Sequence, residues 1–184
     1  MSVGHLGPEV SLDDPAFIHP TALIHGKVRI GRGASVWPYA VFRAEMFEIV
    51  IGERTNIQDF VMIHVGAGTP TIVGADCSIT HHATLHGCTI GDSCLIGIGA
   101  TVMDGAVIGE GSIVAGHAIV TEGSVFPAHS IIAGSPARRA EFSNSGLGSC
   151  ASFRYCSTRA CTLITRLLTL RPVSIVSGAR LTVA

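Results

Sequence analysis

An aliphatic residue or a phenylalanine recurs every six residues along most of this chain of 184 residues. The column has nineteen positions, which are Ile18, Ile24, Ile30, Val36, Phe42, Ile51, Ile57, Ile63, Val73, Ile79, Leu85, Ile90, Ile96, Val102, Ile108, Val114, Val120, Phe126 and Ile132. A six-residue period is typical of a parallel β-helix, in which each hexapeptide supplies a short strand and a corner. Three hexapeptides close one triangular coil. The column therefore predicts an all-β, left-handed parallel β-helix of about six coils, whereas a β-sandwich would need period-two alternation.

The spacing departs from six residues in three places: between Phe42 and Ile51, between Ile63 and Val73, and between Leu85 and Ile90. The first two intervals are longer than six residues. They predict surface loops near Met46–Val50 and Gly66–Ile72.

Charge divides the chain into a body and a tail. Residues 1–141 carry all 13 acidic residues and 7 of the basic ones, whereas residues 142–184 carry five arginines and no acidic residue. We therefore predict an N-terminal lead-in at residues 1–17, a β-helix domain at 18–137, and a C-terminal tail at 138–184. The tail is expected to be disordered, irregular or weakly helical.

Composition also restricts the partners and the compartment. A net charge of −1 gives no electrostatic footprint for nucleic acid. No apolar run approaches the ~20 residues that a membrane-spanning helix needs, and the first residues do not form a secretory signal. The six cysteines form no CxxC pair, which favours reduced thiols in a cytoplasmic protein that binds neither nucleic acid nor membrane.

The histidines at 64, 81 and 86 suggest a metal site once the repeat is taken into account. Arg43, His64 and His86 each follow the inward residue of one face, in three successive coils. Stacked strands lie ~4.8 Å apart, so neighbouring side chains in this column can reach a common metal ion. Asp59 and His81 are stacked on a different face. His81 could therefore join His64 and His86 only from a second copy of the chain.

Three neutral imidazoles and a water form the ligand set of a catalytic zinc ion with an open position. A threefold assembly has three identical interfaces and would hold one such site at each. The residues thus favour a metal ion shared between copies of the chain, with Zn²⁺, Fe²⁺ or Co²⁺ as the candidates. The alternative is an exposed ladder of histidines that binds no metal.

Three segments of the chain resemble the gamma-class carbonic anhydrase-like hexapeptide proteins: VFRAEMFEIVIGERTNIQDFVMIH, HHATLHGCTIGDSCLIGIGATVMDGAVIG and IIAGSPARR. The resemblance covers roughly residues 15–140. The NIQD and HxxxxHGC motifs at this separation are its specific part, because acyltransferases share the hexapeptides. The resemblance implies a homotrimer with zinc at the subunit interfaces, bound by His64 and His86 of one subunit and His81 of its neighbour.

The resemblance also implies roles for five further residues. Gln58 matches the residue that hydrogen-bonds a metal-bound hydroxide, and Asn56 matches a polar residue that lines the same pocket. Arg43 matches an arginine that forms interface salt bridges, with Asp59 as its expected partner. Glu45 stands where the family usually has Asp, and its longer side chain keeps the negative charge.

The activity implied is that of a lyase, the reversible hydration of carbon dioxide to bicarbonate by a metal-bound hydroxide. His82 is a candidate proton shuttle because imidazole titrates near pH 6.5, although an exposed histidine without a role is the simpler interpretation. The acidic loop that carries the shuttle glutamate of the archaeal prototype is absent, since Met46 and Phe47 follow Glu45. Three alternatives remain: a metal-dependent acyl-CoA thioesterase-like hydrolase, a non-catalytic metal-binding trimeric scaffold, and an acyltransferase of the same fold.

Overall fold

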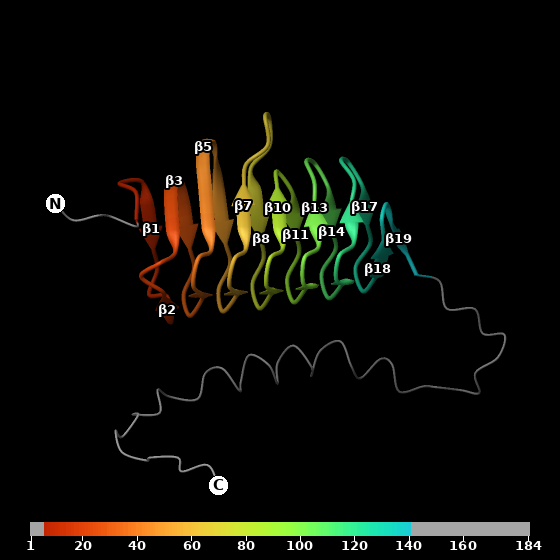
Figure 1. The fold of residues 1–184 in the computed structure, drawn as a ribbon, viewed down its shortest axis with the longest axis horizontal. Helices are drawn as coiled ribbons and strands as arrows, with labels where there is room; N and C mark the ends of the chain where they lie inside the picture. Colours follow the sequence, from red (N-terminus) through yellow and green to blue (C-terminus); the bar gives the residue numbers. More distant parts are fainter. Residues whose placement is uncertain (1–5, 141–184) are drawn as a thin grey trace, which may run out of the picture.

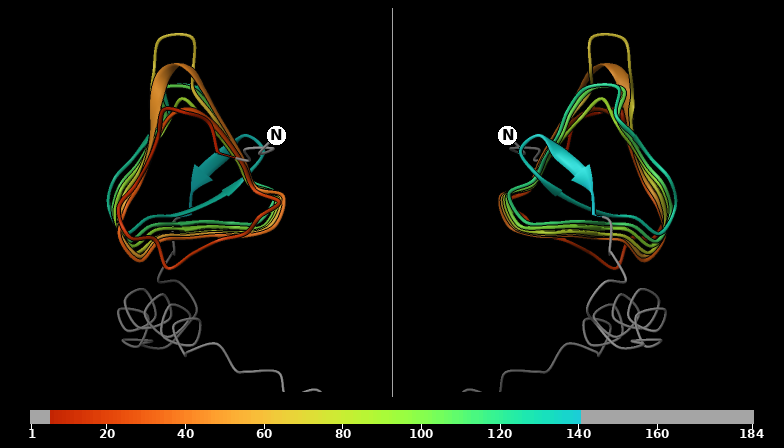
Figure 2. Two further views of the ribbon diagram at one scale, coloured as in Figure 1. Left: turned by 90° about the vertical axis from the view of Figure 1, so that its left-hand side faces the viewer. Right: turned by 90° about the vertical axis from the view of Figure 1, so that its right-hand side faces the viewer.

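Short parallel strands wind into a triangular prism in the computed structural model, which describes residues 6–140 (Figures 1 and 2). Successive strands occupy three faces in turn, and the strands inside each sheet pair in parallel with the strand one coil before and one coil after them. The predicted all-β parallel β-helix is confirmed. The part of the predicted tail from residue 141 onward lies outside the described residues. No helix in the described range is long and apolar enough to cross a membrane.

The three faces are named here by their order along the chain. The first face contains β7 (Met62–His64), β10 (Thr84–His86), β13 (Thr101–Val102) and β16 (Ile119–Val120). The second face contains β8 (Thr71–Val73), β11 (Thr89–Ile90), β14 (Val107–Ile108) and β17 (Val125–Phe126). The third face contains β2 (Phe17–Ile18), β4 (Ser35–Val36), β6 (Asn56–Ile57), β9 (Ser78–Ile79), β12 (Leu95–Ile96), β15 (Ile113–Val114) and β18 (Ile131–Gly134).

Two long strands, β3 (Leu23–Ile30) and β5 (Val41–Ile51), continue from the first face onto the second. They join these two faces into one 11-stranded sheet, to which β1 (Val10–Leu12) adds at β3. The third face forms an 8-stranded sheet that ends in β19 (Ala137–Arg139). The corner between the first and second faces is called the first–second corner below, and the other two are named in the same way.

The prediction of a loop near residues 46–50 is wrong, because these residues belong to strand β5. Strand β3 continues beside them and pairs Val28 with Ile49 after a register shift at Gly26. The extra residues of β5 lie between Ala44 and Ile49 and bulge out at the first–second corner, opposite this register shift. Met46, in the bulge, is 76% exposed. The second predicted loop is present, between the end of β7 and Thr71, and it rises beyond the same corner in yellow in Figure 2.

The hexapeptide column forms the core of the prism. All nineteen predicted positions are buried except Ile18 and Phe126 near the two ends, which are partly buried. Burial of one such side chain is worth about 1.5–3 kcal/mol. The stacked column therefore supplies most of the apolar burial that holds the coils together.

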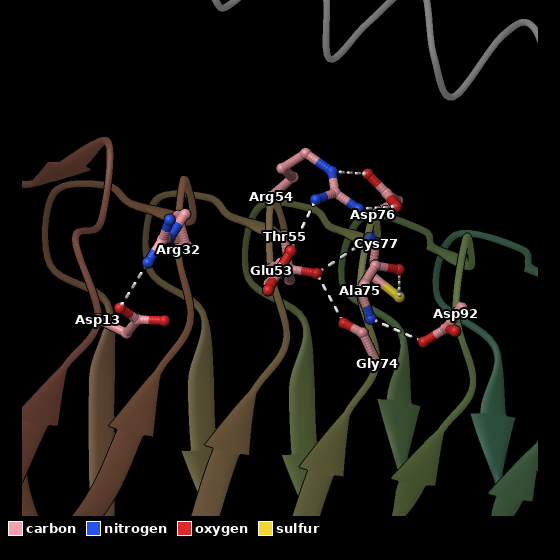
Figure 3. Close-up of polar contacts among 10 residues, drawn as sticks. All are labelled: Asp13, Arg32, Glu53, Arg54, Thr55, Gly74, Ala75, Asp76, Cys77 and Asp92. Atoms are coloured by element: carbon pink, nitrogen blue, oxygen red, sulfur yellow. Dashed lines mark hydrogen bonds and ion pairs between the residues drawn. The ribbon is translucent and has the colours of Figure 1, made fainter.

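Ion pairs join successive coils at the second–third corner (Figure 3). The Arg54 guanidinium donates to both oxygens of Asp76, each at 2.7 Å, and to Glu53 at 2.8 Å. Its hydrogen bond to Asp76 and the charge of that carboxylate raise the pKa of Arg54. One coil further, the backbone N–H of Ala75 donates to Asp92 at 2.8 Å. These groups are half-exposed, so we expect them to set the alignment of the coils more than their stability.

Glycines after the second-face strands let neighbouring coils approach closely. A Cβ built on Gly52 would lie 2.4 Å from the carbonyl carbon of Gly74 and 2.5 Å from the nitrogen of Ala75. We expect Gly52→Ala to lower the free energy of unfolding by about 1–3 kcal/mol, because the backbone of the next coil must move. Gly68→Ala is the control, because nothing lies within 4 Å of a Cβ there. Urea denaturation of both variants measures the difference, and equal stabilities would contradict this account.

Candidate functional site

His64 and His86 lie side by side at the end of the first face. Strands β5, β7 and β10 are paired in register, so Arg43, His64 and His86 follow one another in three coils, as the repeat predicts. Nδ1 of His64 lies 2.9 Å from Nε2 of His86, and the two rings meet edge to face with centroids 4.7 Å apart. Their side chains are only 18% and 30% exposed.

The far nitrogen of each ring contacts a carboxylate. Nε2 of His64 lies 2.9 Å from Glu45, and Nδ1 of His86 contacts Asp104. An ionised carboxylate can only accept a hydrogen bond, so each neutral ring carries its N–H on the nitrogen that faces the carboxylate. In these tautomers the two facing nitrogens carry lone pairs, and lone pairs 2.9 Å apart repel unless a cation lies between them. The pair therefore offers two lone pairs to one cation.

Arg43 and Glu45 belong to the same cluster. The Arg43 guanidinium forms an ion pair with Glu45, and its Nη2 lies 3.4 Å from Nδ1 of His64. Desolvation acts to raise the pKa of the Glu45 carboxyl, but its hydrogen bonds to the backbone and to His64, together with the charge of Arg43, lower that pKa overall. Glu45 is therefore kept as the anion that faces His64.

His81 lies at a different corner, the third–first corner, with Asp59 from the preceding coil. Its Nδ1 is 3.1 Å from Oδ2 of Asp59, and its side chain is 47% exposed. Asp59 thus contacts His81 within one chain, while Arg43 contacts Glu45. The predicted pair of Arg43 with Asp59 could form only between two copies, and it stays a prediction.

Asn56 and Gln58 lie on the third face, on the approach to the corner of His81. Asn56 is 7% exposed and accepts a hydrogen bond of 2.9 Å from Ser35 through its amide oxygen. The half-buried Gln58 directly precedes Asp59. These two predicted pocket residues therefore accompany His81, not His64 and His86.

His82 is the outermost ring of an aromatic stack on that corner. Its ring lies parallel to Phe60 at a centroid distance of 4.9 Å, and Phe60 stacks on Tyr39 at 5.1 Å. All three residues have φ of +59°, the left-handed region that residues of this size seldom adopt. The repeated corner conformation thus holds three rings in line at the surface beside His81.

The predicted site residues therefore form two sets on two corners. One corner holds Arg43, Glu45, His64 and His86, and the other holds Asn56, Gln58, Asp59, His81 and His82. Within residues 6–140 of a single chain, no three His, Cys, Asp or Glu side chains are grouped so as to hold a metal ion. One copy thus offers two facing imidazoles at one corner and a third imidazole at another.

Comparisons with known proteins relate this arrangement to a family. The family model for bacterial transferase hexapeptides (six repeats) matches residues 87–122. The chain is 43% identical over 95 residues to gamma carbonic anhydrase 1, mitochondrial, of Arabidopsis thaliana, a match that covers 48% of this chain and 34% of the relative. It is 47% identical over 79 residues to a probable carbonic anhydrase of Methanocaldococcus jannaschii, which covers 43% of this chain and 50% of the relative.

One crystal structure matches over almost the whole length of both chains. It is a hexapeptide transferase family protein from Anaplasma phagocytophilum, with a TM-score of 0.74, 34% identity, and coverage of 86% of this chain and 90% of that one. The chain belongs to the hexapeptide transferase family. This hexapeptide protein spans half the length or less of the two curated carbonic anhydrase relatives.

The donors of this hexapeptide protein fit a divalent metal ion. Two nitrogens bound to one tetrahedral zinc at about 2.0–2.1 Å lie roughly 3.3 Å apart. Nδ1 of His64 and Nε2 of His86, at 2.9 Å, need to separate by only a few tenths of an ångström. Metal-binding histidines typically donate their other N–H to a carboxylate or carbonyl. Glu45 and Asp104 already occupy that place.

Asp104 is the residue of this candidate site in the hexapeptide protein that the sequence analysis missed. It follows β13, one coil after His86, at the first–second corner. The signal was present in the repeat, because Asp104 is the third residue of its hexapeptide and His86 is the second residue of the hexapeptide stacked below. Asp104 would have been found by looking, one coil after each histidine, for a carboxylate one position further along the hexapeptide.

Proposed function

We propose that this chain is the subunit of a homotrimeric, metal-dependent carbonic anhydrase that catalyses the reversible hydration of carbon dioxide to bicarbonate. His64 and His86 of one subunit and His81 of its neighbour would hold one zinc ion at each of three interfaces. The names of the two curated relatives support the reaction. The placement of the three histidines on two separate corners supports the shared site.

One observation carries the proposal. Each of the three imidazoles contacts a carboxylate through one ring nitrogen and not through the other: His64 with Glu45, His86 with Asp104, and His81 with Asp59. Carboxylate partners of this kind orient metal-binding histidines. Histidines that merely lay exposed on the surface would not need three such partners.

A zinc ion held by these residues would lower the pKa of its bound water to about 7. The residues of the chain would then bind and orient the reactants. Gln58 would enter the interface together with His81, because both lie on the third–first corner, and its amide can donate and accept a hydrogen bond there. Asn56, held by Ser35, would form the wall behind Gln58.

The proton produced by hydration must leave the interface. His82 would carry it to solvent, because its exposed ring directly follows His81 and is held flat against Phe60. Fe²⁺ or Co²⁺ in place of zinc, and a cytoplasmic location, stay predictions. The Arabidopsis relative is named as a mitochondrial protein.

Metal content and stopped-flow CO₂ hydration test the proposal together. We expect the purified trimer to bind one zinc ion per chain and to accelerate hydration above the buffer rate. The His64→Ala variant, prepared in the same way, should neither bind zinc nor accelerate hydration. Its far-UV circular dichroism spectrum should match that of the wild type. A trimer that binds zinc but hydrates no CO₂ with zinc, Fe²⁺ or Co²⁺ would overturn the reaction and leave the metal site standing.

Acyl transfer is the second candidate, because the Anaplasma phagocytophilum relative is named a transferase-family protein. A panel of acyl-CoA thioesters, offered with and without amine acceptors, separates the possibilities. Hydrolysis that requires zinc would indicate the thioesterase-like enzyme, and transfer that persists after chelation would indicate the transferase. Zinc binding with neither activity would indicate a metal-stabilised scaffold.

A further inference from the structure

We propose that Asp104 is a positioning residue for the metal site, because its carboxylate keeps the proton of His86 on Nδ1 and so presents Nε2 to the metal. The inference rests on the proposed function, since it concerns the same metal. It adds Asp104 to the site and specifies which ring nitrogen of His86 binds the metal. His86 and Asp104 are each only about one-third exposed, with side-chain values of 30% and 32%.

The backbone holds Asp104 in place on both sides. The N–H of Gly105 donates to the carbonyl oxygen of Gly87 at 2.8 Å, and the carbonyl oxygen of Asp104 accepts from the N–H of Gly123 at 2.8 Å. Gly87 directly follows His86 in the chain. The ladder of coils thus fixes the carboxylate relative to the imidazole before any metal is present.

Glycines leave the space that the carboxylate occupies. A Cβ built on Gly87 would lie 2.6 Å from Oδ1 of Asp104 and 2.4 Å from Oγ1 of Thr69. A Cβ built on Gly66 would lie 2.9 Å from the same Asp104 oxygen. The loop after β7 therefore closes over Asp104, and its fit around the carboxylate depends on two residues without side chains.

The direction of the hydrogen bond decides what His86 can bind. With a carboxylate at Nδ1, the ring donates from Nδ1 and keeps a lone pair on Nε2, which faces Nδ1 of His64 at 2.9 Å. An amide in the same place can donate its own N–H to Nδ1. The proton of His86 would then move to Nε2, where it blocks the metal.

The experiment compares zinc affinity in the full-length trimer, measured by competition with a chromophoric chelator. We expect Asp104→Asn to weaken zinc binding 10- to 100-fold, the usual effect of removing such a partner. Asp104→Glu keeps a carboxylate and should lose less. Glu122→Gln is the matched control, because Glu122 lies one coil later in the same column and its side chain forms no hydrogen bond or ion pair with residues 6–140. This variant should bind zinc as the wild type does.

A second readout reports the tautomer itself. In the metal-free trimer labelled with ¹⁵N-histidine, the His86 signals, assigned with His86→Gln, should show the proton on Nδ1 in the wild type and on Nε2 in Asp104→Asn. A merely structural role for Asp104 would not move these signals. Equal zinc affinity of Asp104→Asn and wild type, or a loss as large in Glu122→Gln or Asp104→Glu, would overturn the role of Asp104. A wild-type trimer that binds no zinc would overturn the proposed function.

Discussion

Neither His64→Ala nor His81→Ala protein should bind zinc by itself, whereas the two chains refolded together in equal amounts should recover about one quarter of the wild-type sites. Each interface in the mixture needs an intact first–second corner from a His81→Ala chain and an intact His81 from a His64→Ala chain. Random assembly brings these together at about one interface in four. Zinc content per chain and CO₂ hydration should recover in parallel.

A mixture of His64→Ala with His86→Ala is the control. Both changes damage the first–second corner, where the two rings face each other across 2.9 Å. Every first–second corner in that mixture lacks either His64 or His86, so zinc binding should not be recovered. Recovery in this control, or full zinc binding by His81→Ala alone, would show that the metal is not shared between copies in the proposed way.

Phe42→Ala should be the most destabilising single truncation in the prism. Phe42 is fully buried and is among the largest buried side chains, stacked between Ile24 and Ile63 of the adjacent coils. Truncation of a buried phenylalanine leaves a cavity and costs about 3–5 kcal/mol. Urea denaturation of the metal-free protein at one fixed concentration measures the change, because neither metal binding nor dilution then contributes.

Phe60→Ala is the matched control for this truncation. Phe60 belongs to the next coil, but it is 50% exposed on the third–first corner. We expect a loss below about 1 kcal/mol, because the side chain gives up a stacking contact and little burial. Similar losses in the two variants would mean that the inward column does not dominate the stability.

The hexapeptide repeat made two features predictable: the fold, and the placement of His64 and His86 on a different corner from His81. One inward residue per hexapeptide is a strong signal, because each coil repeats the same environment and an error of one residue would put charges into the core. The same frame correctly stacked Arg43 with His64 and His86, and separated them from His81. These properties depend on position in the repeat alone.

The remaining features depend on what lies between the repeats. The residues after Glu45 remain in strand β5 because β3 continues beside them and pairs with them as far as Ile30. The spacing of inward residues within β5 does not predict this pairing, since it depends on the length of β3. The contact of Asp104 with His86 depends on the open space above Gly87. Asp59 was assigned to Arg43 by resemblance, whereas its contact within the chain is His81.

The last strand that the structure describes has a consequence for how another chain can meet this end of the prism. Strand β19 runs antiparallel to β18, and pairs Arg139 with Ile132 and Arg138 with Ala133. A parallel coil left open at this end would be a template for strands of another molecule. The reversed strand and its two arginines mismatch any incoming parallel coil at this face. Lengthwise addition of a further chain is therefore opposed at the third face.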